Sequence, residues 1–498
     1  MLACLLAACG EKPQTQAPSA PTYEDITRLV LADDGITENG APVSTDSTAA
    51  VYTAKDIVYY EAGKDFTYGE GSEKDAHTPE EAAAHTVLHI TQPGAYSLSG
   101  KLSLGQIAVD LGDGAEDDPN AVVTLILEGV DITCNVAPAV IFYNVYECGN
   151  GEAAKDVDTA AAGANVVIAD GTDNTVSGSY VERIYKPDTV VLNEDKTEVE
   201  DAKKLHKYDG AFYSKRSMNI FGDTGKLNIH AENEGLDSEM HLTVNGGNIH
   251  ITSGNDGINT NEDGLSVTTI NGGNVTILVT GDTGEGDGID SNGYLVINGG
   301  TVIAAACSDS ADAGIDSDMG IHIHGGTVIA TGHMLDRIEN GGQNYAVFQF
   351  AQTQTGKETV TLKDANGKVL LETTPENAYS VLIYSGPELK AGTYTLWRDG
   401  AQLAGSGGRM GGPGMRPEGM ERPEGMERPE GMERPEDFTP PEGGVRPEKP
   451  AGDRPEGFGG ERPQDFGGNN FGAQALTPDF VITDGGAMFR GISLYDQT

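Results

Sequence analysis

A glycine pair recurs at a nearly constant interval through the middle of this chain. Three copies read Asn-Gly-Gly and the fourth reads His-Gly-Gly, at residues 245–247, 271–273, 298–300 and 324–326, so the interval is about 26 residues. Each pair separates two short runs rich in β-branched residues, such as LTVNGGNIHI and LVINGGTVIA. A period of this length is typical of proteins built from stacked repeats.

These units predict an all-β fold. Each unit is too short for a strand–helix–strand crossover and contains no helical stripe of apolar residues. A single unit lacks the apolar residues for a core of its own, so we expect the units to stack and to place Val, Ile and Leu in one continuous column. That arrangement is a right-handed parallel β-helix, or solenoid. The Leu-x-x-Leu-x-Leu pattern of leucine-rich repeats is absent, and a propeller needs longer units of four strands.

The turn glycines have a structural role in this interpretation. The Gly-Gly pairs allow positive φ angles at the corners where neighbouring coils touch. Gly257, Gly288 and Gly314 each precede an isoleucine, and Gly235 precedes Leu236. We expect the apolar side chain after each of these glycines to point into the core.

Composition divides the chain into six segments. We predict a lipoprotein signal remnant at 1–9, a linker and N-terminal region at 10–85, the β-helix at 86–335, a small antiparallel β cap domain at 336–404, a disordered Pro/Glu/Gly-rich segment at 405–472, and a C-terminal strand returning to the fold at 473–498. Asn366 and Gly367 predict a hairpin turn in the cap, which would cover the exposed end of the helix. The charged stretch 179–208 lacks a core pattern and is interpreted as an excursion loop.

The first residues look like the end of a bacterial lipoprotein signal. The run LAAC at residues 6–9 is similar to a lipobox, in which the thiol of Cys9 would receive a diacylglyceryl group. No Lys or Arg precedes it, and its apolar run is shorter than the about 7–15 residues expected before a cleavage site. A start codon assigned too far downstream explains both departures, and the alternative is an unprocessed apolar stub. We expect a protein anchored by lipid to the membrane at the bacterial cell surface.

The charge of the chain limits its partners. A formal net charge of −45 argues against nucleic acid as a partner, because phosphate contacts need clusters of Lys and Arg. The same charge favours divalent cations, or simply solubility. The five cysteines show no metal-ligand spacing, although Cys134 and Cys148 are able to pair outside the cell. No run reaches the ~18 apolar residues of a membrane span, and we expect a monomer.

Acidic and amide residues recur at fixed positions of the repeated turns. One position is filled by Asp237, Asn259, Asp290 and Asp316, and a second by Asp256, Asp287 and Ala313, with Glu234 at its start. Adjacent coils lie about 4.8 Å apart, so carboxylates in such a row would repel one another. Ca²⁺ would remove that repulsion, because it takes several oxygen ligands. The alternative is that Asp and Asn are ordinary turn formers. The predicted calcium ligands are Asp237, Asp256, Asn259, Asp287, Asp290 and Asp316.

Residues from about 95 to 335 resemble a bacterial family of carbohydrate-binding domain proteins. The resemblance is carried by GVDI (129–132), ADGTDNTVSG (169–178), DGAFYSKRSMNI (209–220), NEGLDSE (233–239), GNDGINTNEDG (254–264), GEGDGIDSNGYLVINGG (284–300) and DAGIDSDMGIHIHGG (312–326). It implies a right-handed β-helix similar to that of pectate lyases, bound calcium, and binding of plant-type polysaccharide. The excursion loop and the Pro/Glu stretch depart from the family, and Ala313 stands where other units have an acid.

The same scaffold carries polysaccharide lyases and hydrolases, so residues must distinguish an enzyme from a binder. A lyase needs Lys or Arg to remove a proton from the uronate, yet residues 228–355 contain no Lys and only Arg337 as Arg. A hydrolase that uses two carboxylates stays open, because acidic rows supply many suitable pairs by chance. His322 and His324 are interpreted as surface residues. We therefore predict a protein that is not an enzyme.

Binding of polysaccharide is the function that these observations favour. Sugars would stack on exposed aromatic residues such as Tyr294, and calcium would bridge the carboxylates of an acidic glycan to those of the protein. A purely structural surface stalk or adhesin remains an alternative, with the Pro/Glu stretch as a spacer.

Overall fold

The computed structural model describes residues 23–149, 151, 153–409 and 476–495. Strands account for 48% of the residues and helices for 3%, which confirms the predicted all-β class. The α-helix found among these residues, α1 (Pro79–Ala84), begins with a capping box between Thr78 and Glu81. None of the helices in the described part is long and apolar enough to cross a membrane. The predicted lipidation site Cys9, the signal remnant 1–9 and residues 410–472 lie outside the described residues.

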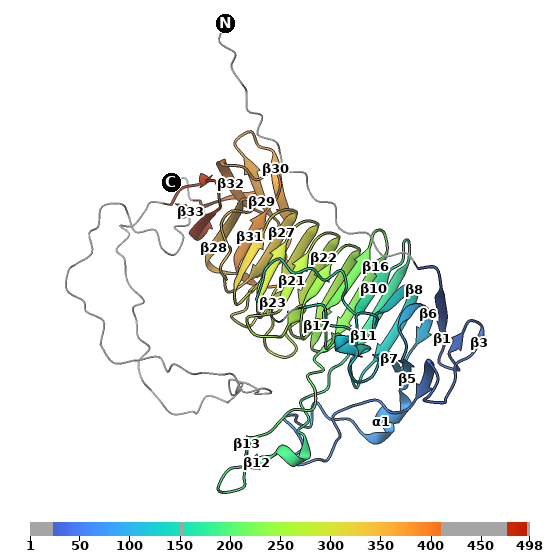
Figure 1. The fold of residues 1–498 in the computed structure, drawn as a ribbon. Coiled ribbons are helices and arrows are strands. Elements are labelled where there is room, and N and C mark those ends of the chain that lie inside the picture. The colour runs from blue at the N-terminus through green and yellow to red at the C-terminus, as the bar shows by residue number, and fades with distance from the viewer. Residues whose placement is uncertain (1–22, 150, 152, 410–475, 496–498) are drawn as a thin grey trace, which may run out of the picture. The chain divides into compact units, whose positions relative to one another are not determined.

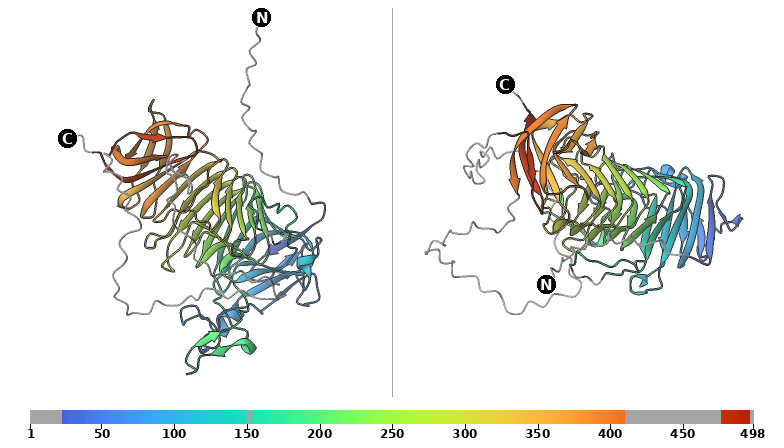
Figure 2. Two further views of the ribbon diagram at one scale, coloured as in Figure 1. Left: turned by 60° about the vertical axis from the view of Figure 1, so that its left-hand side comes forward. Right: turned by 90° about the horizontal axis from the view of Figure 1, so that it is seen from above.

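Three ladders of parallel strands occupy the central part of the chain (Figures 1 and 2). The first ladder contains β1 (Ile26–Leu31), β6 (Gly94–Leu102), β8 (Val123–Cys134), β10 (Ala164–Ile168), β15 (Met218–Gly222), β18 (Leu242–Val244), β21 (Val267–Ile270), β24 (Tyr294–Ile297) and β26 (Gly320–Ile323). The second runs from the end of β8 through β11 (Asp173–Gly178), β16 (Lys226–Ala231), β19 (Asn248–Ser253), β22 (Asn274–Val279), β25 (Thr301–Ala305) and β27 (Thr327–Gly332). The third contains β5 (Thr86–Ile90), β7 (Gly105–Asp110), β9 (Val140–Asn144), β14 (Gly210–Ser214), β17 (Glu234–Ser238), β20 (Ile258–Thr260) and β23 (Ile289–Ser291).

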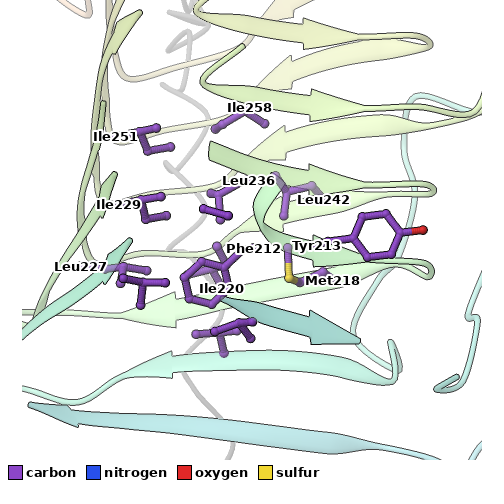
Figure 3. Close-up of a cluster of buried hydrophobic side chains, with 14 of the residues drawn as sticks. Phe212, Tyr213, Met218, Ile220, Leu227, Ile229, Leu236, Leu242, Ile251 and Ile258 are labelled. Carbon is purple, nitrogen blue, oxygen red and sulfur yellow. The ribbon is translucent and has the colours of Figure 1, made fainter. Parts of the chain in front are cut away.

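From β14 to β25 the chain visits the third, first and second ladders in the same order in every circuit. Apolar residues at one position of each circuit therefore meet. Ile229, Ile251 and Ile277 are in register in the second ladder, and all three are buried. Figure 3 shows the first two of these beside Leu236 and Ile258 of the third ladder. Burial of each such side chain contributes about 1.5–3 kcal/mol to folding, so the column stabilises the stack of circuits.

The turn glycines behave as their positions predict. The second glycine of each pair at 245–247, 271–273, 298–300 and 324–326 has a φ angle between 77° and 96°, a region that favours glycine. Gly257 has a different constraint, because a Cβ at this position would lie 2.1 Å from Cγ2 of Ile277 and 2.6 Å from the carbonyl oxygen of Gly288. A larger residue there would push neighbouring circuits apart.

Antiparallel strands follow the last circuit. They are β28 (Tyr345–Gln354), β29 (Val360–Asp364), β30 (Val369–Thr373), β31 (Tyr379–Ser385), β32 (Gly392–Arg398), β33 (Ala401–Arg409), β34 (Phe480–Ile482) and β35 (Ala487–Leu494). β31 pairs with β27, and β35 returns to lie parallel to β28. A second apolar core forms here around Phe348, Phe480 and Phe489. The β29–β30 hairpin has Gly367 at φ 83° in its turn. The boundaries of the six segments stay predictions.

Within the predicted linker and N-terminal region 10–85, residues 26–54 contain four strands. In β1, Leu29 and Leu31 are buried against the first circuits, whereas Val30 between them is exposed. The region adds β2 (Thr37–Glu38), β3 (Ala41–Pro42) and β4 (Val51–Ala54), and the excursion 179–208 holds the small pair β12 (Val191–Leu192) and β13 (Val199–Asp201). Cys134 and Cys148, which the sequence left able to pair, are both free thiols.

Candidate metal centre

The predicted acidic row is assembled on the third ladder. Asp237, Asn259 and Asp290 are directly in register on β17, β20 and β23. Asp316 follows without a strand of its own, and its amide donates a hydrogen bond to the carbonyl oxygen of Ile289. Parallel pairing in this register brings residues that are 22 to 31 positions apart in sequence to neighbouring points of one sheet. The row separates into two clusters with different surroundings.

The inner cluster consists of Asp209, Glu234 and Asp237. One carboxylate oxygen from each residue lies within 4.8 Å of the others, and all three residues are buried. Asn259 donates to Oε1 of Glu234 at 3.1 Å, and Asn261 donates to Oδ1 of Asp237 at 2.5 Å. The remaining oxygens, Oε2 of Glu234, Oδ2 of Asp237 and Oδ1 of Asn259, are buried without a hydrogen-bond partner. Buried oxygens of this kind are normally satisfied, so a donor or a cation would suit this cluster.

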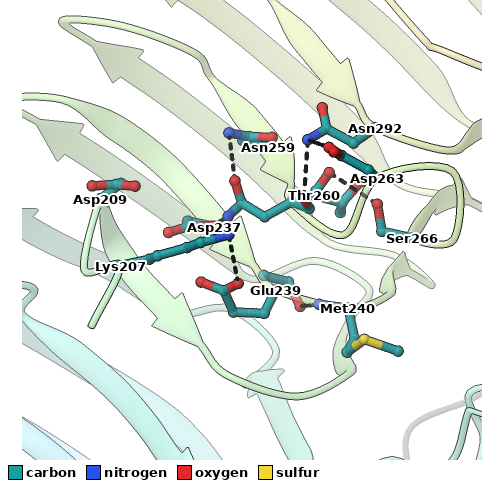
Figure 4. Close-up of polar contacts among 12 residues, drawn as sticks. Lys207, Asp209, Asp237, Glu239, Met240, Asn259, Thr260, Asp263, Ser266 and Asn292 are labelled. Atoms are coloured by element: carbon teal, nitrogen blue, oxygen red, sulfur yellow. Dashed lines mark hydrogen bonds and ion pairs between the residues drawn. The ribbon is translucent and has the colours of Figure 1, made fainter. Parts of the chain in front are cut away.

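Two basic residues reach the inner cluster from the excursion 179–208. Arg183 forms an ion pair with Asp209, and Lys207 lies 3.5 Å from Glu239. Figure 4 shows Lys207, Asp209 and Asp237 together with Glu239. The ligand set predicted from sequence omitted Asp209, and it gave no role to Arg183 or Lys207. Glu234 was recognised only as the start of a row. The sequence gives little indication of a role for Arg183 and Lys207, because only the folded excursion brings these basic residues to the ladder.

Electrostatics make the inner cluster costly without a cation. Burial raises the pKa of Glu234 and of Asp237 well above the usual range for carboxylates, and the neighbouring carboxylates raise both pKa values further. Four carboxylates and two basic groups meet here, counting Glu239, and together they carry a net charge of −2 when all are ionised. Glu182 beside Arg183 and Asp256 beside Glu234 add further negative charge, so a cation would be favoured here.

The outer cluster consists of Asp287, Asp290 and Asp316. Its carboxylate oxygens also lie within 4.8 Å of one another, but the three residues are only partly buried. Burial, followed by repulsion from nearby aspartates, raises the pKa of Asp287 to about 9, that of Asp290 to about 7 and that of Asp316 to about 6. Oδ1 of Asp316 has no hydrogen-bond partner.

Asp256 and Asn259 lie between the two clusters. Oδ1 of Asp256 accepts a hydrogen bond from the amide of Asp287 at 2.7 Å, and Oδ1 of Asp287 accepts one from the amide of Ala313 at 2.5 Å. Asp256 and Asp287, which share the second repeated turn position, therefore link successive turns by hydrogen bonds to backbone amides. Asp256 belongs to neither cluster, although burial raises its pKa well above the usual range.

Tyr294 lies on a different ladder from the acidic row. It begins β24 in the first ladder, and its half-buried ring is 5.6 Å from the ring of His322. The ring of His322 is in turn 6.0 Å from that of His324. The three rings form an aromatic row on the first ladder.

Both clusters offer what a hard cation requires. Two oxygens bound to one Ca²⁺ at about 2.3–2.6 Å lie at most about 5 Å apart, and the spacing in both clusters is within that limit. The ligand atoms are all oxygens, which suits Ca²⁺ better than zinc or copper. Each cluster also has an unpartnered oxygen that a cation would satisfy.

Comparison with known proteins identifies the family. The model of a family described as "Carbohydrate-binding domain-containing protein" matches residues 84–371, which is more than half of the chain. The chain belongs to this family. A carbohydrate-binding domain-containing protein of Acetivibrio thermocellus is 31% identical over 165 residues, which is 33% of this chain and 44% of that relative. The match thus spans less than half the length of the relative. No solved structure matches the chain.

The match to the carbohydrate-binding domain family includes every residue of both clusters, the excursion and Tyr294. The resemblance seen in the sequence motifs is therefore confirmed for the family. Membership supports carbohydrate as the ligand of this chain.

Proposed function

We propose that this chain binds acidic, plant-type polysaccharide with the help of calcium, on a right-handed parallel β-helix, at the bacterial cell surface. The observation that carries the proposal is the pair of carboxylate clusters on one ladder, each with its oxygens within 4.8 Å. Family membership supports the carbohydrate, and the repeated order of the three ladders supports the β-helix.

The inner cluster would hold calcium through Asp209, Glu234 and Asp237, with Asn259 as a further oxygen ligand. The outer cluster would hold it through Asp287, Asp290 and Asp316. Bound Ca²⁺ would supply positive charge for a sugar carboxylate in a region where the protein alone repels one. The half-buried carboxylates of the outer cluster keep contact with solvent, so this cluster is the one that a glycan is able to reach. Tyr294 would add a stacking surface on the first ladder.

Two features favour binding over catalysis. The basic residues near the inner cluster are engaged, because Arg183 pairs with Asp209 and Lys207 pairs with Glu239. A lyase base must instead reach the proton next to the sugar carboxylate. A hydrolase would need two carboxyl groups on either side of a sugar bond, and the inner carboxylates are buried. Release of unsaturated uronides, seen as ultraviolet absorbance, would replace this proposal by a lyase.

Location and assembly complete the proposal. Cys9 would carry the lipid that anchors the protein to the membrane, and the protein would act as a monomer with polysaccharide as its partner. Mass spectrometry of the protein isolated from its own membranes tests the anchor, because a diacylglyceryl group on Cys9 adds a defined mass. A chain that keeps residues 1–8 and carries no lipid contradicts the surface location.

Calorimetry with hexagalacturonate tests the function directly. We expect binding in millimolar calcium, loss of binding in EDTA, and recovery when calcium is added back. Calcium-dependent stability without any glycan binding would instead favour the structural stalk. Binding that EDTA leaves unchanged would contradict the role of calcium.

A further inference from the structure

A groove of about 270 Å³ lies along the end of the second ladder, and none of its lining residues belongs to either carboxylate cluster. Four of its lining residues are in register on consecutive strands, namely Thr133 on β8, Ser177 on β11, His230 on β16 and Thr252 on β19. Successive strands lie about 4.8 Å apart, so these polar side chains form a row of about 14 Å along the stacking direction.

The strands themselves make this row point outward. The residue before each member, at positions 132, 176, 229 and 251, belongs to the buried apolar core. Side chains alternate between the two faces of a strand, so the row faces away from that core. Small residues come directly after two members of the row, Gly178 after Ser177 and Ala231 after His230, and these two small residues are paired on neighbouring strands. The groove therefore results from the register of these strands and extends across β8, β11, β16 and β19.

Two carboxylates at the groove are held by local hydrogen bonds. Oε2 of Glu232 accepts a hydrogen bond from Ser179 at 2.5 Å, and Oδ2 of Asp282 accepts one from Thr280 at 2.9 Å. Among the described lining residues there is no Lys or Arg. Fixed carboxylates accept strong hydrogen bonds from hydroxyl groups, but without a basic partner they repel an anionic sugar.

We propose that this groove binds a neutral polysaccharide, with the chain lying across the strands so that successive sugars meet Ser177, His230 and Thr252. The inference rests on carbohydrate binding as proposed above, but it assigns a second class of glycan to a separate site that needs no calcium. Hydroxyl groups of the protein and the two carboxylates supply the matching donors and acceptors. The acidic glycan and the neutral glycan would thus bind to different parts of the ladders.

The test measures binding of neutral and acidic hexasaccharides to the full chain by calorimetry. The neutral probes are gluco-, manno- and xylohexaose with β-1,4 links, and the acidic probe is hexagalacturonate. Thr252→Trp fills the groove, and we expect it to weaken neutral binding at least about tenfold, which corresponds to about 1.4 kcal/mol. Hexagalacturonate binding should be unchanged in this variant. EDTA should leave neutral binding intact in the wild-type protein.

His250→Trp is the matched control, because His250 is exposed on the same strand two residues earlier and does not line the groove. Thr252→Val and His230→Ala, which remove single polar groups, provide the test if the tryptophan variant does not fold. Equal neutral binding by the wild-type and the folded groove variants would overturn the inference, as would the failure of all three neutral probes to bind. Failure of the calcium proposal is seen separately, in the hexagalacturonate measurements.

Discussion

The inner and outer clusters use the same residue types on the same ladder, yet their surroundings differ. Asp237 of the inner cluster is fully buried, and the excursion 179–208 brings Arg183 and Lys207 to its neighbours. The outer cluster is only partly buried, and within the described residues its three carboxylates form no ion pair with Lys or Arg. Repetition alone thus produces a row of oxygens, while burial and an inserted segment decide what each part of the row is able to do.

If both clusters hold calcium as proposed, the inner cluster would have a structural role and the outer cluster would face the ligand. A cation enclosed by buried oxygens stabilises the fold, because it removes the cost of burying like charges. A cation held by half-exposed oxygens retains positions that a glycan carboxylate is able to take.

The largest expected effect follows Asp237→Asn. In saturating calcium we expect a loss of about 4 kcal/mol in the free energy of unfolding, the stabilisation that a ligand gives at about 1,000 times its Kd. In EDTA at pH 8 the same variant should be at least as stable as the wild type, because the amide removes a buried negative charge. Urea unfolding with and without calcium measures both values.

A variant that is destabilised in calcium but not in EDTA has lost a cation ligand, whereas loss of an ordinary structural residue would destabilise the protein in both conditions. Asp309→Asn is the matched control, because Asp309 is exposed and outside both clusters, and it should change neither value. Equal destabilisation by Asp237→Asn in calcium and in EDTA would contradict a metal role for the inner cluster.

Arg183→Met tests whether the excursion neutralises the inner cluster. In EDTA, loss of the ion pair leaves the carboxylate of Asp209 buried without its partner, which typically costs about 3 kcal/mol or more. Arg337→Met is the control, since the pair of Arg337 with Glu339 is more exposed and should contribute no more than about 1 kcal/mol. Similar urea midpoints for the two variants would show that the excursion covers the ladder without neutralising the charge of the inner cluster.

A pH titration in EDTA tests how the carboxylates of the outer cluster bind protons. Asp287, Asp290 and Asp316 have folded pKa values of about 9, 7 and 6, above the value of about 4 in an unfolded chain. Protonation therefore favours the folded state, so their contribution to stability is full below about pH 4 and is lost as the pH rises through the folded pKa values. The loss should be at most about 1.4 kcal/mol per pH unit for each titrating group, reduced by solvent screening.

Melting temperatures between pH 5 and pH 9 measure this loss. Saturating calcium should abolish most of it, because a bound cation replaces the protons. An EDTA-treated protein whose melting temperature is constant over this range would show that the outer carboxylates do not interact as their spacing implies.

Part of this arrangement was predictable from the sequence. Asp237, Asn259 and Asp290 occupy the same position in successive repeated turns. Because a parallel ladder pairs equivalent positions of successive repeats, this predicted that the three residues are in register. The ion pair of Arg183 with Asp209 was not predictable, since an excursion without periodicity can return to many places. The strand at 26–31 was missed because its short apolar run has no clear alternation and lies within a polar region. The groove was missed because it depends on the register of β8 and β11, which precede the Asn-Gly-Gly turns.

The smallest effect on stability is expected for Asp290→Asn. Half-exposed oxygens keep water as a partner, so in saturating calcium the free energy of unfolding should fall by no more than about 1 kcal/mol. Hexagalacturonate binding should nevertheless weaken at least about tenfold, because the proposal places the glycan at this cluster. Asp237→Asn should show the opposite balance wherever it remains folded, with a large loss of stability and glycan binding within about threefold of the wild type. If both variants lost stability and glycan binding in the same proportion, the two clusters would form one site, and the division between a structural and a ligand-facing cation would be wrong.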